Sequence, residues 1–203
     1  MATNGKPGMQ LPKVTINSPV VLWFVIVCVA VQVVSTLTGG ASTDALFTFH
    51  TSSLSSPLEF FRLVTFAFGH ISWDHLIGNM SYILLLGPLL EEKYGSPRLV
   101  AVILTSALTC SIASIVIFHT GGVGASGVVF TFLILSSVTR VREGEIPLTF
   151  ILVGTFYLCQ QLYGAIFVRA FVSYHGHIIG GLTGAALGFL LPEKSSADSR
   201  GIF

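Results

Sequence analysis

Charge is the scarcest property of this chain. Only 9% of its 203 residues are Asp, Glu, Lys or Arg, whereas 52% are hydrophobic, and the mean hydropathy is +0.83. Soluble globular domains carry about 25% charged residues. This composition therefore excludes a soluble globular domain and indicates a protein of the lipid bilayer. The formal net charge of +1 provides no basic surplus. Nucleic-acid binding is therefore excluded as well.

Metal-binding and redox patterns are also missing. The three cysteines, Cys28, Cys110 and Cys159, each lie in an apolar stretch, and none has C-x-x-C spacing, so we interpret them as buried membrane thiols. No H-E-x-x-H motif occurs. His175 and His177 are two positions apart and would point about 200° apart on a helix. We expect neither a metal nor a cofactor.

Long apolar stretches are abundant instead. Six of them are about 17–25 residues long, which is the length that a helix needs to cross a bilayer. They are residues 19–37, 74–90, 97–118, 123–139, 147–168 and 174–191, of which the fourth is short. The sequence thus predicts an all-α, six-helix membrane domain over 19–191, between short tails at 1–18 and 192–203. In the long connection 38–73, charges accompany the apolar stretch 58–68, so we expect a helix lying in the interface there.

The basic residues predict the orientation of these spans. Eight of them lie on the side of the two termini: Lys6, Lys13, Lys93, Arg98, Arg140, Arg142, Lys194 and Arg200. Only Arg62 and Arg169 lie on the other side. The positive-inside rule then predicts a multi-pass protein with both termini in the cytoplasm, in the cell membrane if the chain is prokaryotic. The second, fourth and sixth spans consequently all run inward and begin at one depth.

Polar side chains stand at the start of each inward-running span. His75 and Asn79 open the second, Ser126 opens the fourth and His177 opens the sixth, each within about two helical turns of the outer boundary. A serine needs a base to become a nucleophile, and His177 is the best-placed candidate. Asp74 lies at the water boundary and we place every other acid in a loop or tail. The prediction is therefore a Ser–His dyad.

Glycines recur at every fourth position of the last span, at Gly176, Gly180, Gly184 and Gly188. This spacing lines one helix face, where a neighbouring helix can approach closely. His177 lies on the same stripe. If the neighbour is the fourth span, Ser126 and His177 come within hydrogen-bond reach.

Donors for a developing oxyanion are present as well. Gly124 and Gly127 flank the serine and leave the backbone N–H groups of Ala125 and Ser126 open at a helix N-terminus.

His75 and Asn79, four residues apart, share a helix face and can add two side-chain donors, although both also suit a role as interhelical hydrogen-bond partners. Phe130, one turn below the serine, suits an apolar floor beneath the imidazole, or simply the core.

Taken together, these residues resemble the rhomboid family of intramembrane serine proteases. The matching stretches are Phe61-Arg62, His70 through Asn79, Glu91 through Gly95, Gly124-Ala125-Ser126-Gly127 and His177 through Gly184. The resemblance implies a six-helix core that cleaves transmembrane protein substrates near their outer end, with Ser126 as nucleophile and His177 as base. His75 and Asn79 match the family's oxyanion-stabilising positions, and Gly124 matches the glycine before the serine. Phe61 and Phe130 stand where tryptophan and tyrosine are frequent, and Gly176 stands where alanine is.

Two other functions remain as alternatives. The first is a non-catalytic rhomboid-like protein that binds client transmembrane helices. The second is a small channel or transporter, which should carry polar groups at mid-depth in several spans. The interior halves of these spans read as almost wholly apolar, which disfavours the transporter.

Overall fold

A computed structural model describes residues 15–51, 56–142 and 174–194, together with the isolated positions 144–146, 148, 151, 152, 155, 156, 159 and 163. Over these residues, regular structure consists of helices and one isolated β-bridge, between Phe49 and Gly122. The predicted all-α class is therefore confirmed for the part of the chain that the structure describes.

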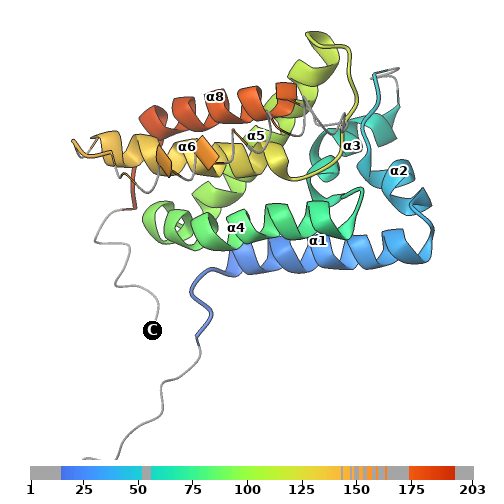
Figure 1. Ribbon diagram of the computed structural model, residues 1–203, viewed down its shortest axis with the longest axis horizontal. Coiled ribbons are helices and arrows are strands. Elements are labelled where there is room, and N and C mark those ends of the chain that lie inside the picture. The colour runs from blue at the N-terminus through green and yellow to red at the C-terminus, as the bar shows by residue number, and fades with distance from the viewer. Residues whose placement is uncertain are drawn as a thin grey trace, which may run out of the picture.

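Among the described residues, five long helices build the body of the molecule. They are α1 (Pro19–Leu37), α4 (Trp73–Tyr94), α5 (Ser96–Val116), α6 (Ser126–Arg142) and α8 (Tyr174–Leu190). In Figure 1, α1 lies beside α4, α6 lies beside α8, and α5 crosses behind them. Because α4 contacts α6 as well, α4, α6 and α8 belong to one helical cluster.

The expected spans agree with these helices to within four residues at each end. By length and apolarity, α1 and α5 qualify as membrane-crossing helices, and α6 contains the shorter apolar helix Ser126–Val138. The expected fifth span, 147–168, falls largely outside the described residues. The count of six spans thus stays a prediction.

Local sequence signals explain where the helices begin and end. The hydroxyl of Ser72 accepts a hydrogen bond from the backbone N–H of His75 and caps α4. Gly95 ends α4 with φ +83°, in the left-handed region that favours glycine, and Pro97 follows in the first turn of α5. A two-helix corner with almost no loop results.

The connection between α1 and α4 is a compact scaffold. It contains α2 (Ala41–Phe47), α3 (Pro57–Thr65) and the short 3-10 helix η1 (Phe66–Phe68). A helix is present over 58–68 as expected, in the form of α3 with η1, while its position in the membrane interface stays a prediction; α2 was not predicted. Arg62 pairs with Glu59 and donates to the carbonyl of Ala45, so it joins α3 to α2.

Three expectations about buried groups are wrong. Glu91 was placed in a loop, but it lies within α4 and is only 4% exposed. The spans were read as apolar at mid-depth, but buried hydroxyls of Ser106 and Thr131 meet there. All three cysteines are free as expected, but only Cys28 and Cys110 are buried, and Cys159 is exposed. These errors share a cause, because burial depends on neighbours that a single span does not show.

Candidate active site

The entry of α6 is held by a glycine that no other residue can replace without strain. Gly124 has φ +126°, and a Cβ there would lie 2.6 Å from Cε1 of His75. The backbone N–H of Gly124 donates to the carbonyl of Phe66 at 2.9 Å. The scaffold of the long connection therefore fixes this backbone, and the imidazole of His75 lies directly against it, two residues before Ser126.

The glycine face of α8 packs on α6. A Cβ at Gly180 would lie 2.3 Å from the carbonyl oxygen of Gly127, and one at Gly184 would lie 2.4 Å from that of Thr131. Both obstacles are backbone atoms, which cannot rotate away as the end of a side chain can. The two helices thus touch backbone to backbone beside the first turns of α6.

This contact places the imidazole of His177 over α6. The rings of His177 and Phe130 stack, with centroids 4.6 Å apart and planes inclined by 18°. Phe130 is four residues after Ser126 and so shares its helix face. His177 is buried, and Ser126 is half-buried at the start of its helix. The structure thus brings the histidine to the side of α6 on which the serine lies.

The remaining predicted residues lie on α4 and around the start of α6. Asn79 is buried on α4, one turn after the half-buried His75, and Ala125 is fully buried. Gly127 lies against the thiol of Cys110, because a Cβ there would be 2.7 Å from Sγ. The thiol in turn donates to the carbonyl of Gly176 at 3.4 Å. Cys110 was expected only as a buried thiol, so its place behind both helices of the site was missed.

Two further histidines lie near the site. His175 stacks on Phe118, with ring centroids 3.9 Å apart, and is thus packed away from the Phe130 ring that His177 covers. His70 is fully buried and meets His75 edge-on, with ring centroids 5.1 Å apart. Burial, assisted by the neighbouring His75, lowers the pKa of His70 to about 3. This ring is therefore neutral at physiological pH.

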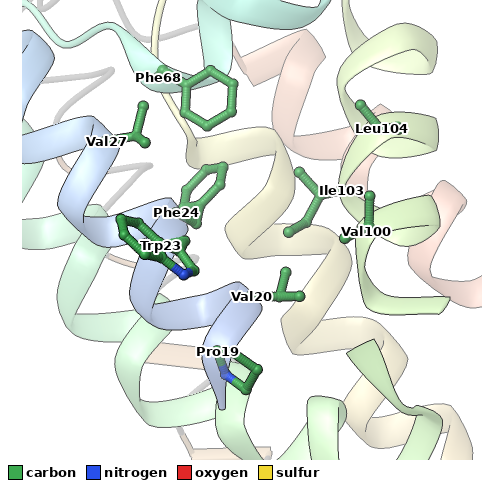
Figure 2. Close-up of a pocket in the computed structure, with 9 residues that line it drawn as sticks. All are labelled: Pro19, Val20, Trp23, Phe24, Val27, Phe68, Val100, Ile103 and Leu104. Carbon is green, nitrogen blue, oxygen red and sulfur yellow. The ribbon is translucent and has the colours of Figure 1, made fainter. Parts of the chain in front are cut away.

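Two other features of the described residues were compared with this site: clusters of metal-binding side chains and an apolar groove between α1 and α5. Among the residues that the structure describes, no group of three His, Cys, Asp or Glu side chains is placed to hold a metal ion. A groove of about 320 Å³ lies between α1 and α5, where Trp23, Phe24, Phe68 and Ile103 line it (Figure 2). Its nine lining residues are all apolar. They offer no acid, base or nucleophile.

Comparison with known proteins identifies the family. The described residues form a helical protein in which two helices are long and apolar enough to cross a membrane, and the rhomboid domain family model matches residues 57–194. The chain therefore belongs to the rhomboid family. The matched region includes every candidate residue described above, from His75 to Gly184.

Several curated rhomboid proteins are similar to this chain. The rhomboid protease GluP of Bacillus subtilis is 31% identical over 169 residues, which are 80% of this chain and 33% of that protein. Rhomboid-like protein 11, a chloroplastic protein of Arabidopsis thaliana, is 26% identical over 68% of this chain and 55% of its own length. The rhomboid protease GlpG of Yersinia pestis is 25% identical over 63% of this chain and 45% of its own. The chain thus spans about half the length, or less, of these relatives.

Proposed function

We propose that this protein is an intramembrane serine endopeptidase that cleaves transmembrane protein substrates near their outer end, with Ser126 as nucleophile and His177 as general base. The observation that carries this proposal is the packing of α8 on α6. Backbone contact at Gly180 and Gly127, with the His177 ring stacked on Phe130, puts an imidazole beside the helix face of the serine. Similarity to two proteins named rhomboid proteases supports the reaction class.

The chemistry follows from these groups. Ser126 Oγ attacks the carbonyl carbon of the scissile peptide bond while the imidazole of His177 takes the hydroxyl proton. The carbonyl oxygen becomes negatively charged. His177 then gives the proton to the leaving amine as the C–N bond breaks. A water, deprotonated by the same imidazole, hydrolyses the acyl-enzyme and restores the serine.

The proposed oxyanion donors come from two helices. The backbone N–H groups of Ala125 and Ser126 stand at the N-terminus of α6, where no intrahelical carbonyl is available to them. The side chains of His75 and Asn79 reach the site from α4. The close fit of the His75 ring to Gly124 supports this assignment, because it holds a side-chain donor against the backbone that precedes the serine. Donors fixed before the reaction stabilise the developing charge without reorganisation.

Substrate and water must both reach the dyad. The charge bias predicts that α4, α6 and α8 begin near the outer face, with both termini in the cytoplasm. Water would enter from that side, since acylation ends only by hydrolysis. A substrate helix has to unwind to expose its peptide bond, so small or helix-breaking residues are expected near the cleavage point.

One experiment tests the proposal directly. The purified full chain is treated with a fluorophosphonate probe, and the labelled residue is mapped, alongside cleavage of a model transmembrane substrate. We expect labelling at Ser126, loss of labelling and cleavage in Ser126→Ala and His177→Ala, and retention of both in Ser81→Ala. The Ser81 hydroxyl bonds the Ile77 carbonyl of its own helix and is exposed, which makes it a matched control. A folded wild type that neither labels nor cleaves would instead favour a protein that only holds client helices.

A further inference from the structure

A cluster of hydroxyl groups joins three helices at mid-length, below the proposed dyad. The hydroxyls of Ser106 on α5 and Thr131 on α6 lie 2.8 Å apart, and both side chains are fully buried. The hydroxyls of Thr109 on α5 and Thr183 on α8 also lie 2.8 Å apart. Burying a polar group inside a membrane helix bundle costs free energy unless the group forms a hydrogen bond, so these paired hydroxyls are expected to have a structural role.

Thr131 is the member of this cluster whose hydroxyl contacts backbone carbonyls of both α6 and α8. Its hydroxyl oxygen lies 3.0 Å from the carbonyl of Gly127 on its own helix and 2.9 Å from the carbonyl of Gly180 on α8. A buried helical threonine can satisfy its hydroxyl within its own helix, through the carbonyl four residues earlier. The second carbonyl, on another helix, is the informative contact.

The protons can be distributed consistently. Ser106 can donate to Thr131, which leaves the single Thr131 proton to be shared between the carbonyls of Gly127 and Gly180. The hydroxyl of one residue then ties two backbone carbonyls together. α6 and α8 touch backbone to backbone at this point, because a Cβ at Gly180 would lie 2.3 Å from the carbonyl oxygen of Gly127.

Both carbonyls stand next to the proposed catalytic residues in the sequence. Gly127 directly follows Ser126, and Gly180 comes three residues, or about one helical turn, after His177. A smooth glycine contact alone would let α8 slide along α6 or roll on it. A directional hydrogen bond opposes both motions, because its strength falls as the donor leaves the line to the acceptor.

We propose that Thr131 is a positioning residue: its hydroxyl sets the register of α8 on α6 and thereby the separation of Ser126 from His177. This inference rests on the proposed function, since it concerns the same dyad. Ser106 supports the hydroxyl from α5. The side chain of Thr131 acts through the helix backbones and does not touch the reacting atoms.

Positioning and plain stabilisation predict different results. A misplacement of 1 Å in a catalytic site can cost about a hundredfold in rate, whereas a single hydrogen bond between membrane helices contributes little to stability. Loss of the Thr131 hydroxyl should therefore reduce kcat far more than it reduces the melting temperature. KM should change little, because no substrate contact is removed.

The test compares three variants of the full chain in detergent and in liposomes. Thr131→Val keeps the branched shape without the hydroxyl, Thr131→Ser keeps the hydroxyl without the methyl group, and Thr131→Ala lacks both. For Thr131→Val and Thr131→Ala we expect kcat and the rate of fluorophosphonate labelling to fall by about tenfold to a hundredfold, with KM within about twofold. Thr131→Ser should stay within about threefold of the wild type in kcat, although it loses the same methyl group as Thr131→Ala.

The possible failures can be told apart. If Thr131→Ala and Thr131→Ser have equal kcat, the hydroxyl does not position the dyad and the inference is overturned. The same holds if activity falls only in step with melting temperature across all three variants. Should Thr131→Val not fold, the comparison of alanine with serine decides alone. If the folded wild type is not labelled at Ser126, the proposed function fails and this inference falls with it.

Discussion

Replacement of Glu91 should destabilise the protein more than any other single charge removal in α4. Its carboxylate accepts from the backbone N–H groups of Val20 at 3.0 Å and Val21 at 3.1 Å, and from the hydroxyl of Ser96 at 2.7 Å. Val20 and Val21 follow Pro19 in the first turn of α1, where N–H groups lack intrahelical partners. The Ser18 side chain makes no capping bond. Glu91 therefore caps α1 from a different helix.

The size of the effect follows from these contacts. Both carboxylate oxygens face donors, so in Glu91→Gln the amide nitrogen must face at least one N–H or O–H group. A hydrogen bond to a charged group contributes about 1.5–3 kcal/mol, and the negative charge also favours the N-terminus of a helix. We expect a loss of about 2–4 kcal/mol in the free energy of unfolding. At about 2–4 °C per kcal/mol for a chain of this size, the melting temperature should fall by roughly 4–16 °C.

The assay is thermal unfolding of the purified protein, followed by circular dichroism or by a thiol-reactive dye at the buried cysteines. Glu92→Gln is the matched control, because Glu92 is its exposed neighbour, and its effect should stay within about 0.5 kcal/mol. Glu91 is sixteen residues from His75 along α4, or about 24 Å, so activity below the melting transition should survive. Equal melting temperatures for the two variants would refute the capping role.

Three other predictions concern Gly180, Gly124 and His70. Gly180→Ala should lower both activity and melting temperature because its Cβ meets backbone atoms, whereas Gly181→Ala should be tolerated because its Cβ would lie 3.6 Å from a side chain. Equal activity and melting temperature in the two variants would show that the backbone contact is not required. Gly124→Ala should abolish measurable turnover in the cleavage assay, since it combines a strained φ of +126° with a clash on a histidine ring; an active variant would count against the site. His70 has a pKa of about 3 in the folded protein, so the unfolded chain binds its proton first as the pH falls below about 6.5. The free energy of unfolding should therefore be full above a pH of about 6.5 and decline toward pH 3, with a loss of about 2 kcal/mol at pH 5. Chemical denaturation across this range should show a smaller pH dependence of the unfolding free energy in His70→Gln, and an unchanged pH dependence would contradict the prediction.

The sequence predicted the long helices well, because apolar length and punctuation are local properties. α1 begins at Pro19 as predicted, whereas α4 continues to Tyr94, four residues beyond the predicted end of the second span at Leu90, and Gly95 follows it. The helix α2 was missed, since seven residues in a polar connection carry no clear periodicity. The span at 147–168 falls largely outside the described residues, so its prediction stands as it was made.

Contacts between distant residues could not be predicted in the same way. The bonds from Glu91 to α1 join positions 70 and 71 residues apart, and a glutamate near a helix end ordinarily faces solvent. The hydroxyls of Ser106 and Thr131 are 25 residues apart. Each alone reads as a small residue tolerated in a membrane helix. Only the packing of α5, α6 and α8 shows that they meet.

The glycines show which features of the site can be predicted from the sequence and which cannot. The four-residue spacing in α8 predicts a smooth face, but it does not say which helix covers that face. The structure supplies α6 as the partner and assigns different causes to different glycines. Gly180 is required because another backbone lies where its side chain would be, and Gly124 because its own backbone is left-handed and a histidine ring covers it. In a bilayer, where lipid tails compete equally for apolar surface, such backbone contacts set how closely two helices approach but leave their register free. The proposed Ser126–His177 dyad would need a fixed register, and the buried Thr131 hydroxyl, which contacts carbonyls of both helices beside their glycine contact, is the directional bond that we propose supplies it.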